Sequence, residues 1–111
     1  MLLGRKSMEW YLYVAYFFGG AFLVNAVPHF TEGLCGRSFP SPFASPPGKG
    51  LSSPTVNMFW GAFNLIVAYL LICRVGEFSV RQNSSVIVLG VGGLLTGVQL
   101  SRHFGSVNRG K

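Results

Sequence analysis

Three long stretches of the sequence contain no Lys, Arg, Asp or Glu and are dominated by apolar side chains: residues 10–27, 56–73 and 84–101. Each is 18 residues long, at the short end of the roughly 17–25 residues that an α-helix needs to cross a bilayer. Lipid offers no water to exposed backbone groups, so a helix is the expected structure for each stretch. A membrane β-barrel would need strands of alternating polarity, and these stretches do not alternate. The sequence therefore predicts an all-α membrane protein, with three transmembrane helices in a single membrane domain over residues 1–111.

The charge content supports the same class. Charged residues make up 11% of the chain, whereas a typical soluble domain carries roughly 25%. Nine Lys and Arg stand against three acidic residues, which gives a net charge of +6. The cations are scattered and form no basic stripe of the kind that nucleic-acid binding requires. We therefore expect the lipid bilayer and its anionic headgroups as partners, and no nucleic acid.

The first stretch has two readings. Arg5 and Lys6 precede it as they would precede the apolar core of a signal peptide. Its length and its many aromatic residues favour an uncleaved membrane helix, and the two cations favour a cytoplasmic N-terminus. Pro28 predicts the end of this helix. All six prolines fall within residues 28–54, so we expect a long Pro/Gly-rich loop there, and a loop of this length is usually functional or disordered.

The second stretch carries a polar pattern at helical spacing. Asn57, Gly61, Asn64 and Ala68 follow one another at i, i+4, i+7 and i+11, which places them on one face of a helix. Small residues let two helices approach closely, and Asn can form a hydrogen bond to a neighbouring helix. We interpret this stripe as a packing face. The alternative is a polar lining for a ligand or ion.

The third stretch repeats glycine at Gly90, Gly93 and Gly97. The pair 93 and 97 forms the small-x-x-x-small motif of packed membrane helices. A dimer and a contact within the same chain explain this motif equally well. Thr96 and Gln99 add polar groups that need partners in the membrane.

Residues with metal-binding side chains occur at the start of the expected loop. His29, Glu32 and Cys35 are three positions apart, and zinc accepts all three side-chain types. His103 is the only other histidine, and the predicted topology places it on the same side of the membrane as the 28–54 loop. Zinc sites usually show clearer paired spacing, so we predict no metal site and no cofactor. The three residues remain candidates for a ligand-binding loop.

The two cysteines are predicted to stay apart. Cys35 precedes the second helix and Cys73 lies at its far end. A helix over residues 56–73 would be roughly 27 Å long at 1.5 Å per residue. A disulfide tolerates only about 7 Å between Cα atoms.

The middle third of the chain carries a resemblance. Its residues are Pro28-His29-Phe30, Gly33, Gly36, Phe39 to Ala44, Pro47 to Gly50, Ser52-Ser53-Pro54, Asn57, Trp60-Gly61 and Asn64. This pattern resembles a group of small, uncharacterised bacterial integral membrane proteins. The resemblance implies a location in the bacterial inner membrane, and it implies no activity, cofactor or catalytic residue.

Together these observations predict a non-enzymatic membrane subunit or interaction protein, which assembles as a homo-oligomer or with other membrane proteins. Two alternatives stay open. One is a membrane enzyme or a ligand- or metal-binding protein that uses the 28–54 loop. The other is an oligomeric channel or transporter component built around the asparagine stripe.

Overall fold

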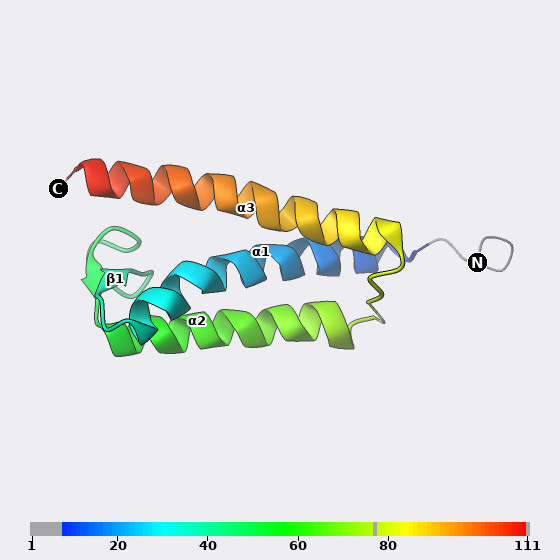
Figure 1. Cartoon of the computed structure of the whole chain (residues 1–111), viewed down its shortest axis with the longest axis horizontal. Coiled ribbons are helices and arrows are strands. Elements are labelled where there is room, and N and C mark those ends of the chain that lie inside the picture. The colour runs from blue at the N-terminus through cyan, green and yellow to red at the C-terminus, as the bar shows by residue number, and fades with distance from the viewer. Residues whose placement is uncertain (1–7, 77, 111) are drawn as a thin grey trace, which may run out of the picture.

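The computed structural model describes residues 8–76 and 78–110. Three helices dominate it, and a short antiparallel pair of strands lies in the connection between the first two (Figure 1). In chain order the elements are α1 (Trp10–Leu34), β1 (Phe39–Pro40), β2 (Leu51–Ser52), α2 (Pro54–Tyr69), the π-helical turn η1 (Leu70–Arg74) and α3 (Asn83–Arg109).

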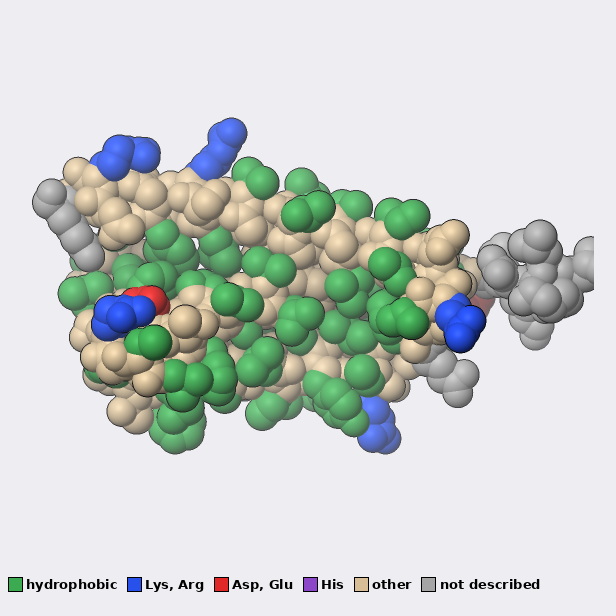
Figure 2. All heavy atoms as spheres, viewed as in Figure 1, with side chains coloured by type: hydrophobic (Ala, Val, Ile, Leu, Met, Phe, Trp, Pro, Cys, Tyr) green, Lys and Arg blue, Asp and Glu red, His purple; other side chains and the backbone are tan. Residues whose placement is uncertain are grey.

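The prediction of membrane-spanning helices is confirmed at the level of length and composition. The spans Trp10–Leu34, Pro54–Arg74 and Asn83–Arg109 are each long and apolar enough to cross a membrane. On the face shown in Figure 2, hydrophobic side chains cover the middle of the long axis, and Lys and Arg side chains lie toward its ends. This distribution fits a multi-pass membrane protein.

The predicted end of the first helix at Pro28 is wrong. α1 continues through this proline to Leu34, although proline lacks the N–H that would bond to the carbonyl four residues earlier. Membrane helices tolerate such a gap because packing against neighbouring elements holds the segment in place. Here the turns after Pro28 pack against the start of α2, where a Cβ on Gly33 would lie 2.5 Å from the backbone nitrogen of Met58.

The connection is therefore shorter than the predicted loop. It runs over residues 35–53 rather than 28–54. Ser41 is 1% exposed and organises it: its carbonyl accepts from the backbone N–H of Gly48 at 2.8 Å, and its hydroxyl bonds to that of Ser52. The N-cap Ser53 then starts α2 by accepting from the N–H of Val56 at 3.2 Å.

The third helix is longer than the predicted stretch 84–101. Residues 102–109 continue α3 as a helix beyond that stretch. This extension lies over the 35–53 connection, where the His103 ring nitrogen Nε2 is 2.6 Å from the carbonyl oxygen of Gly48.

The helices are arranged around α1. Extensive contacts join α1 to α2 and to α3, whereas α2 and α3 scarcely touch each other in the described residues (Figure 1). Glycines make both interfaces close: a Cβ on Gly61 would lie 2.6 Å from the Cβ of Phe30, and one on Gly92 would collide with the carbonyl oxygen of Phe17. Because α1 packs against both other helices, its position determines which polar side chains can meet inside the described part of the molecule.

Candidate functional site

The asparagine stripe of α2 faces α1. Asn57, Gly61, Asn64 and Ala68 are the buried residues of this helix, and both asparagine side chains are fully buried. For these residues to line a pore between copies of the chain, α2 would have to separate from α1.

Asn57 connects α1, α2 and the 35–53 connection. Its side-chain nitrogen Nδ2 donates to the carbonyl oxygen of Phe39 at 2.8 Å and also contacts the carbonyls of Ser52 and Ser53. Its oxygen Oδ1 lies 2.8 Å from Nδ1 of His29. Since carbonyls can only accept, Nδ2 is the donor and Oδ1 the acceptor. His29 therefore carries its proton on Nδ1, and in its neutral form the lone pair is on Nε2.

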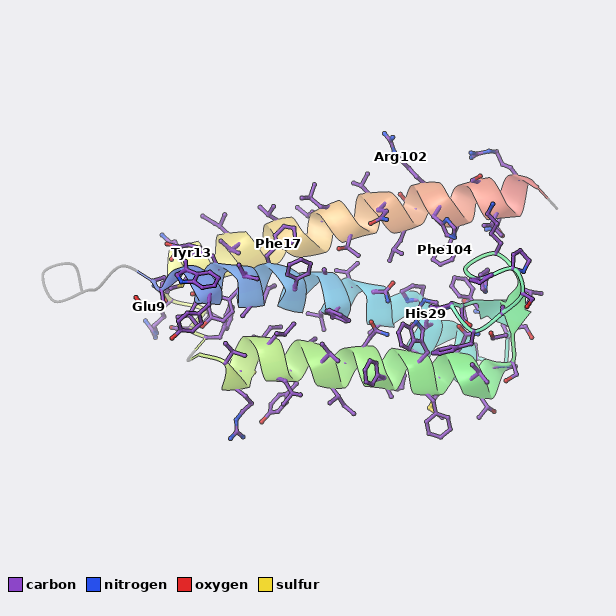
Figure 3. The ribbon with its side chains drawn as sticks, turned by 180° about the vertical axis from the view of Figure 1, so that it is seen from behind. Glu9, Tyr13, Phe17, His29, Arg102 and Phe104 are labelled. Atoms are coloured by element: carbon purple, nitrogen blue, oxygen red, sulfur yellow. The ribbon has the colours of Figure 1, made fainter. Side chains whose placement is uncertain are left out.

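An aromatic cluster surrounds His29, which is 3% exposed. Its ring centroid lies 5.4 Å from that of Phe39 and 6.2 Å from that of Phe104, and the two phenylalanines are 4.7 Å apart. Figure 3 shows His29 and Phe104 at the same end of the molecule, on α1 and on the extension of α3. The connection, α1 and α3 are thus joined at this end by aromatic contacts and by the bond that His103 donates to Gly48.

A second polar contact lies deeper along the helices. Nδ2 of Asn25 donates to Oδ1 of Asn64 at 3.0 Å, and Nδ2 of Asn64 donates to the carbonyl oxygen of Trp60 at 2.8 Å. Interhelical hydrogen bonds of this kind contribute roughly 0.6–1.7 kcal/mol each in membranes.

A pocket of about 220 Å³ adjoins this second contact. All three helices contribute to its wall, which is formed by Ala21, Phe22, Asn25, Trp60, Asn64 and Thr96. Among the residues that the structure describes, the indole Nε1–H of Trp60 is the buried side-chain polar group without a hydrogen-bond partner. The wall therefore contains amide and hydroxyl side chains, and one of its residues, Trp60, has a buried N–H that finds no partner in the described residues.

The sequence identified only part of this set. Asn64 belongs to the predicted stripe, and Thr96 was marked as a polar group in need of a partner. Asn25 and Trp60 were missed. Asn25 stands alone among apolar residues of the first stretch, and a lone amide in a membrane helix is itself a signal for an interhelical partner.

The three glycines predicted on α3 differ in their surroundings. Gly93 is buried, and a Cβ there would lie 3.0 Å from the Val24 side chain. At Gly97 the nearest atom, also of Val24, would be 3.9 Å away, and at Gly90 nothing lies within 4 Å. A Cβ at Gly92, which the small-x-x-x-small pattern does not include, would instead collide with the carbonyl oxygen of Phe17 on α1.

His29, Glu32 and Cys35 do not converge. His29 is bonded to Asn57, Glu32 forms an ion pair with Arg37 at 2.7 Å, and Cys35 is free and exposed, as is Cys73. The hydrogen bond that Arg37 donates to the Glu32 carboxylate raises the pKa of Arg37 above its ordinary value. His29 and Glu32 belong to α1 and not to a loop, and within residues 8–76 and 78–110 no three His, Cys, Asp or Glu residues form a group that could hold a metal.

No protein-family model, curated protein or solved structure matches the chain.

Proposed function

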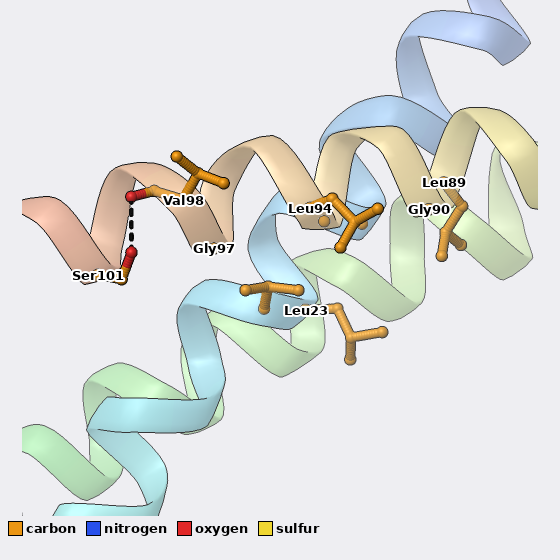
Figure 4. A pocket seen from close by; sticks show the side chains of 10 residues that line it. Leu23, Leu89, Gly90, Leu94, Gly97, Val98 and Ser101 are labelled. Atoms are coloured by element: carbon orange, nitrogen blue, oxygen red, sulfur yellow. Dashed lines mark hydrogen bonds between the residues drawn. The ribbon is translucent and has the colours of Figure 1, made fainter.

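We propose that the chain is a non-enzymatic membrane subunit that binds a transmembrane helix of another membrane protein. The observation that supports this proposal is an apolar groove of about 560 Å³ between α1 and α3 (Figure 4). Its α3 side is lined by residues from Leu89 to Ser101, and its α1 side by Gly20, Leu23 and Val24.

The groove contains the glycines that internal packing leaves open. Gly90 and Gly97 both line it, and a Cβ at either position would meet no atom closer than 3.9 Å. In lipid, where the hydrophobic effect does not drive helices together, small residues promote association because they let two backbones approach closely. Glycine also costs a helix about 1 kcal/mol relative to alanine. Close packing of an approaching helix against Gly90 and Gly97 would compensate for this cost.

The dimensions of the groove fit a helix. From Leu89 to Ser101 it extends roughly 18 Å at 1.5 Å per residue, more than half of the roughly 30 Å hydrocarbon thickness of a bilayer. The side chains that line it carry no charge, as expected for a surface that meets an apolar partner in the membrane.

Crosslinking tests the proposal. In a variant whose Cys35 and Cys73 are replaced by Ser, Leu94→Cys places one thiol in the groove. A crosslinker that is thiol-reactive at one end and photoreactive at the other, added to native membranes and illuminated, should yield an adduct of defined mass. Adding Gly97→Leu should reduce this adduct at least fivefold because the side chain fills the groove, whereas Val91→Leu, on an exposed position outside the groove, should leave it unchanged.

The mass of the adduct identifies the partner. Twice the mass of the chain indicates a homo-oligomer, and any other defined mass indicates a different subunit. If Leu94→Cys stays uncrosslinked while an exposed thiol at position 91 reacts with the same reagent, the groove faces lipid and the proposal is wrong.

We also propose a location in the bacterial inner membrane with the N-terminus in the cytoplasm. The resemblance over the middle third of the chain supports the location in the inner membrane. Arg5 and Lys6 before the first helix support the cytoplasmic N-terminus. Fractionation of bacterial membranes on a density gradient checks the inner-membrane location. Recovery of the protein with outer-membrane porins would contradict it.

A further inference from the structure

The end of the molecule that holds the 35–53 connection is closed over one histidine. Phe39 of the connection and Phe104 of the α3 extension pack against the ring of His29, which is 3% exposed. The two phenylalanines also pack on each other, with ring centroids 4.7 Å apart. A hydrogen bond from His103 to the connection adds to these contacts. The extension and the connection are thus joined around one buried ionisable side chain.

The surroundings of His29 suit its neutral form and not its charged form. Nδ1 donates to the amide oxygen of Asn57, and the ring makes no second hydrogen bond within the described residues. Protonation of Nε2 would create a donor without an acceptor and would bury a positive charge, and both are unfavourable away from water. Aromatic faces attract a cation, but more weakly than the water that the enclosure excludes.

Within the described elements, no free carboxylate faces His29 to compensate for a charge. The acidic side chain of the elements packed against it is Glu32, one turn further along α1, and both of its oxygens accept from Arg37. α2 contributes no Asp, Glu, Lys, Arg or His. The other ionisable side chains of the connection and the extension are Cys35, Lys49, Arg102, His103 and Arg109. Figure 3 shows Arg102 pointing away from the bundle. None of these groups is a counter-ion for an imidazolium.

The cover over His29 is easier to displace than the helices beside it. α1 and α2 interlock where Gly33 and Gly61 leave no room for a Cβ, and α3 is in close contact with α1 at Gly92. The extension begins roughly 15 Å further along α3 than Gly92, at 1.5 Å per residue. A charge on His29 would therefore be relieved by moving the two phenylalanines away, which admits water to the ring.

We infer that His29 is the trigger of an acid-sensitive latch between the 35–53 connection and the α3 extension. While the ring is neutral, the aromatic cluster holds the extension on the connection. When the ring gains a proton, the cluster opens and the extension separates. His103 is not the trigger, because its Nε2–H can donate to the carbonyl oxygen of Gly48 in both the neutral and the protonated form. The latch responds to acidity on the side of the membrane that the connection faces.

The latch can be measured without a partner in the groove between α1 and α3, whose lining on α3 ends at Ser101. Lys49 of the connection and Ser106 of the extension line one pocket of about 370 Å³. In a chain whose Cys35 and Cys73 are replaced by Ser, spin labels on Lys49→Cys and Ser106→Cys report their separation by dipolar broadening in nanodiscs. The broadening should fall roughly twofold or more between about pH 8 and about pH 5, the range in which histidine titrates.

Two matched variants identify the ring that titrates. His29→Asn keeps an N–H donor for Asn57 but cannot gain a proton, so its labels should stay close at both pH values. His103→Gln keeps a donor for the carbonyl of Gly48 and should show the same transition as the parent. In the parent without labels, ¹H–¹⁵N spectra of the histidine rings should show His29 gaining its proton over the same pH range.

Three outcomes of the label experiment overturn the inference: a broadening that does not depend on pH, a transition that persists in His29→Asn, or labels that stay close at both pH values in His103→Gln. If His29→Asn does not fold, the ring spectra decide. A His29 ring that stays neutral while the labels separate overturns the inference, and coincident midpoints support it.

Discussion

Asn57 holds together three parts of the molecule that are distant in the sequence. One amide group bonds to His29 on α1 and to the carbonyl of Phe39 in the connection, while the residue itself sits in the first turns of α2. The spacing of the stripe predicted that Asn57 would face inward, because position on a helix follows from 100° per residue. It did not predict the bond to His29, which the same sequence placed in a candidate ligand-binding loop.

We expect Asn57→Leu to lower the free energy of unfolding by about 1–3 kcal/mol, because the N–H of His29 and the carbonyl of Phe39 lose a buried partner. Loss of helicity on titration with sodium dodecyl sulfate, in mixed micelles, measures the change. Asn108→Leu, on an exposed position of α3, serves as the matched control. Equal unfolding curves for the two variants would show that the Asn57 amide is not a significant source of stability.

At the scale of the element, the contact between α1 and α3 depends on glycines that a motif alone does not identify. The sequence pattern pointed to Gly90, Gly93 and Gly97, yet it is at Gly92 that an added Cβ would collide with the backbone of α1. Gly90 and Gly92 belong to the same turn of α3. The free space beside them differs because each one faces a different direction. That direction depends on where α1 lies, which the pattern within α3 does not contain.

Gly90 and Gly92 form a matched pair for a test of this helix contact. Gly92→Ala should lower the free energy of unfolding by about 1–3 kcal/mol, because the new methyl group collides with the Phe17 carbonyl and separates the helices. Gly90→Ala meets open space and should change stability by about 1 kcal/mol or less, in the stabilising direction, since alanine is the better helix former. The same detergent titration measures both variants. Similar losses in the two would mean that α3 does not pack on α1 as described.

The whole molecule is elongated, with principal extents of 56 × 24 × 20 Å, and the two cysteines lie near opposite ends of it. Cys35 follows the last turn of α1. Cys73 lies in η1, beside the earlier turns of α1, where Gly19 approaches Ile72. If the long axis crosses the membrane, the two thiols face opposite compartments.

We therefore expect a membrane-impermeant maleimide to label only one cysteine from each side. Right-side-out vesicles of the single variants Cys35→Ser and Cys73→Ser should give one labelled and one unlabelled protein, and inverted vesicles should give the reverse. With the N-terminus in the cytoplasm, Cys35 is the residue labelled from outside. Labelling of both cysteines from the same side would contradict the three-span topology.

The sequence by itself determined that three segments are apolar enough for a bilayer, because the cost of transferring a helix into lipid is close to a sum over its own residues. It also determined which face of α2 is buried. The tertiary structure decided that α1 passes Pro28, that α3 extends over the connection, and that Asn25, Asn64, Trp60 and Thr96 surround one pocket. The reason is that a hydrogen bond or a close backbone contact depends on two groups at once, and the second group lies on an element whose position no local pattern specifies.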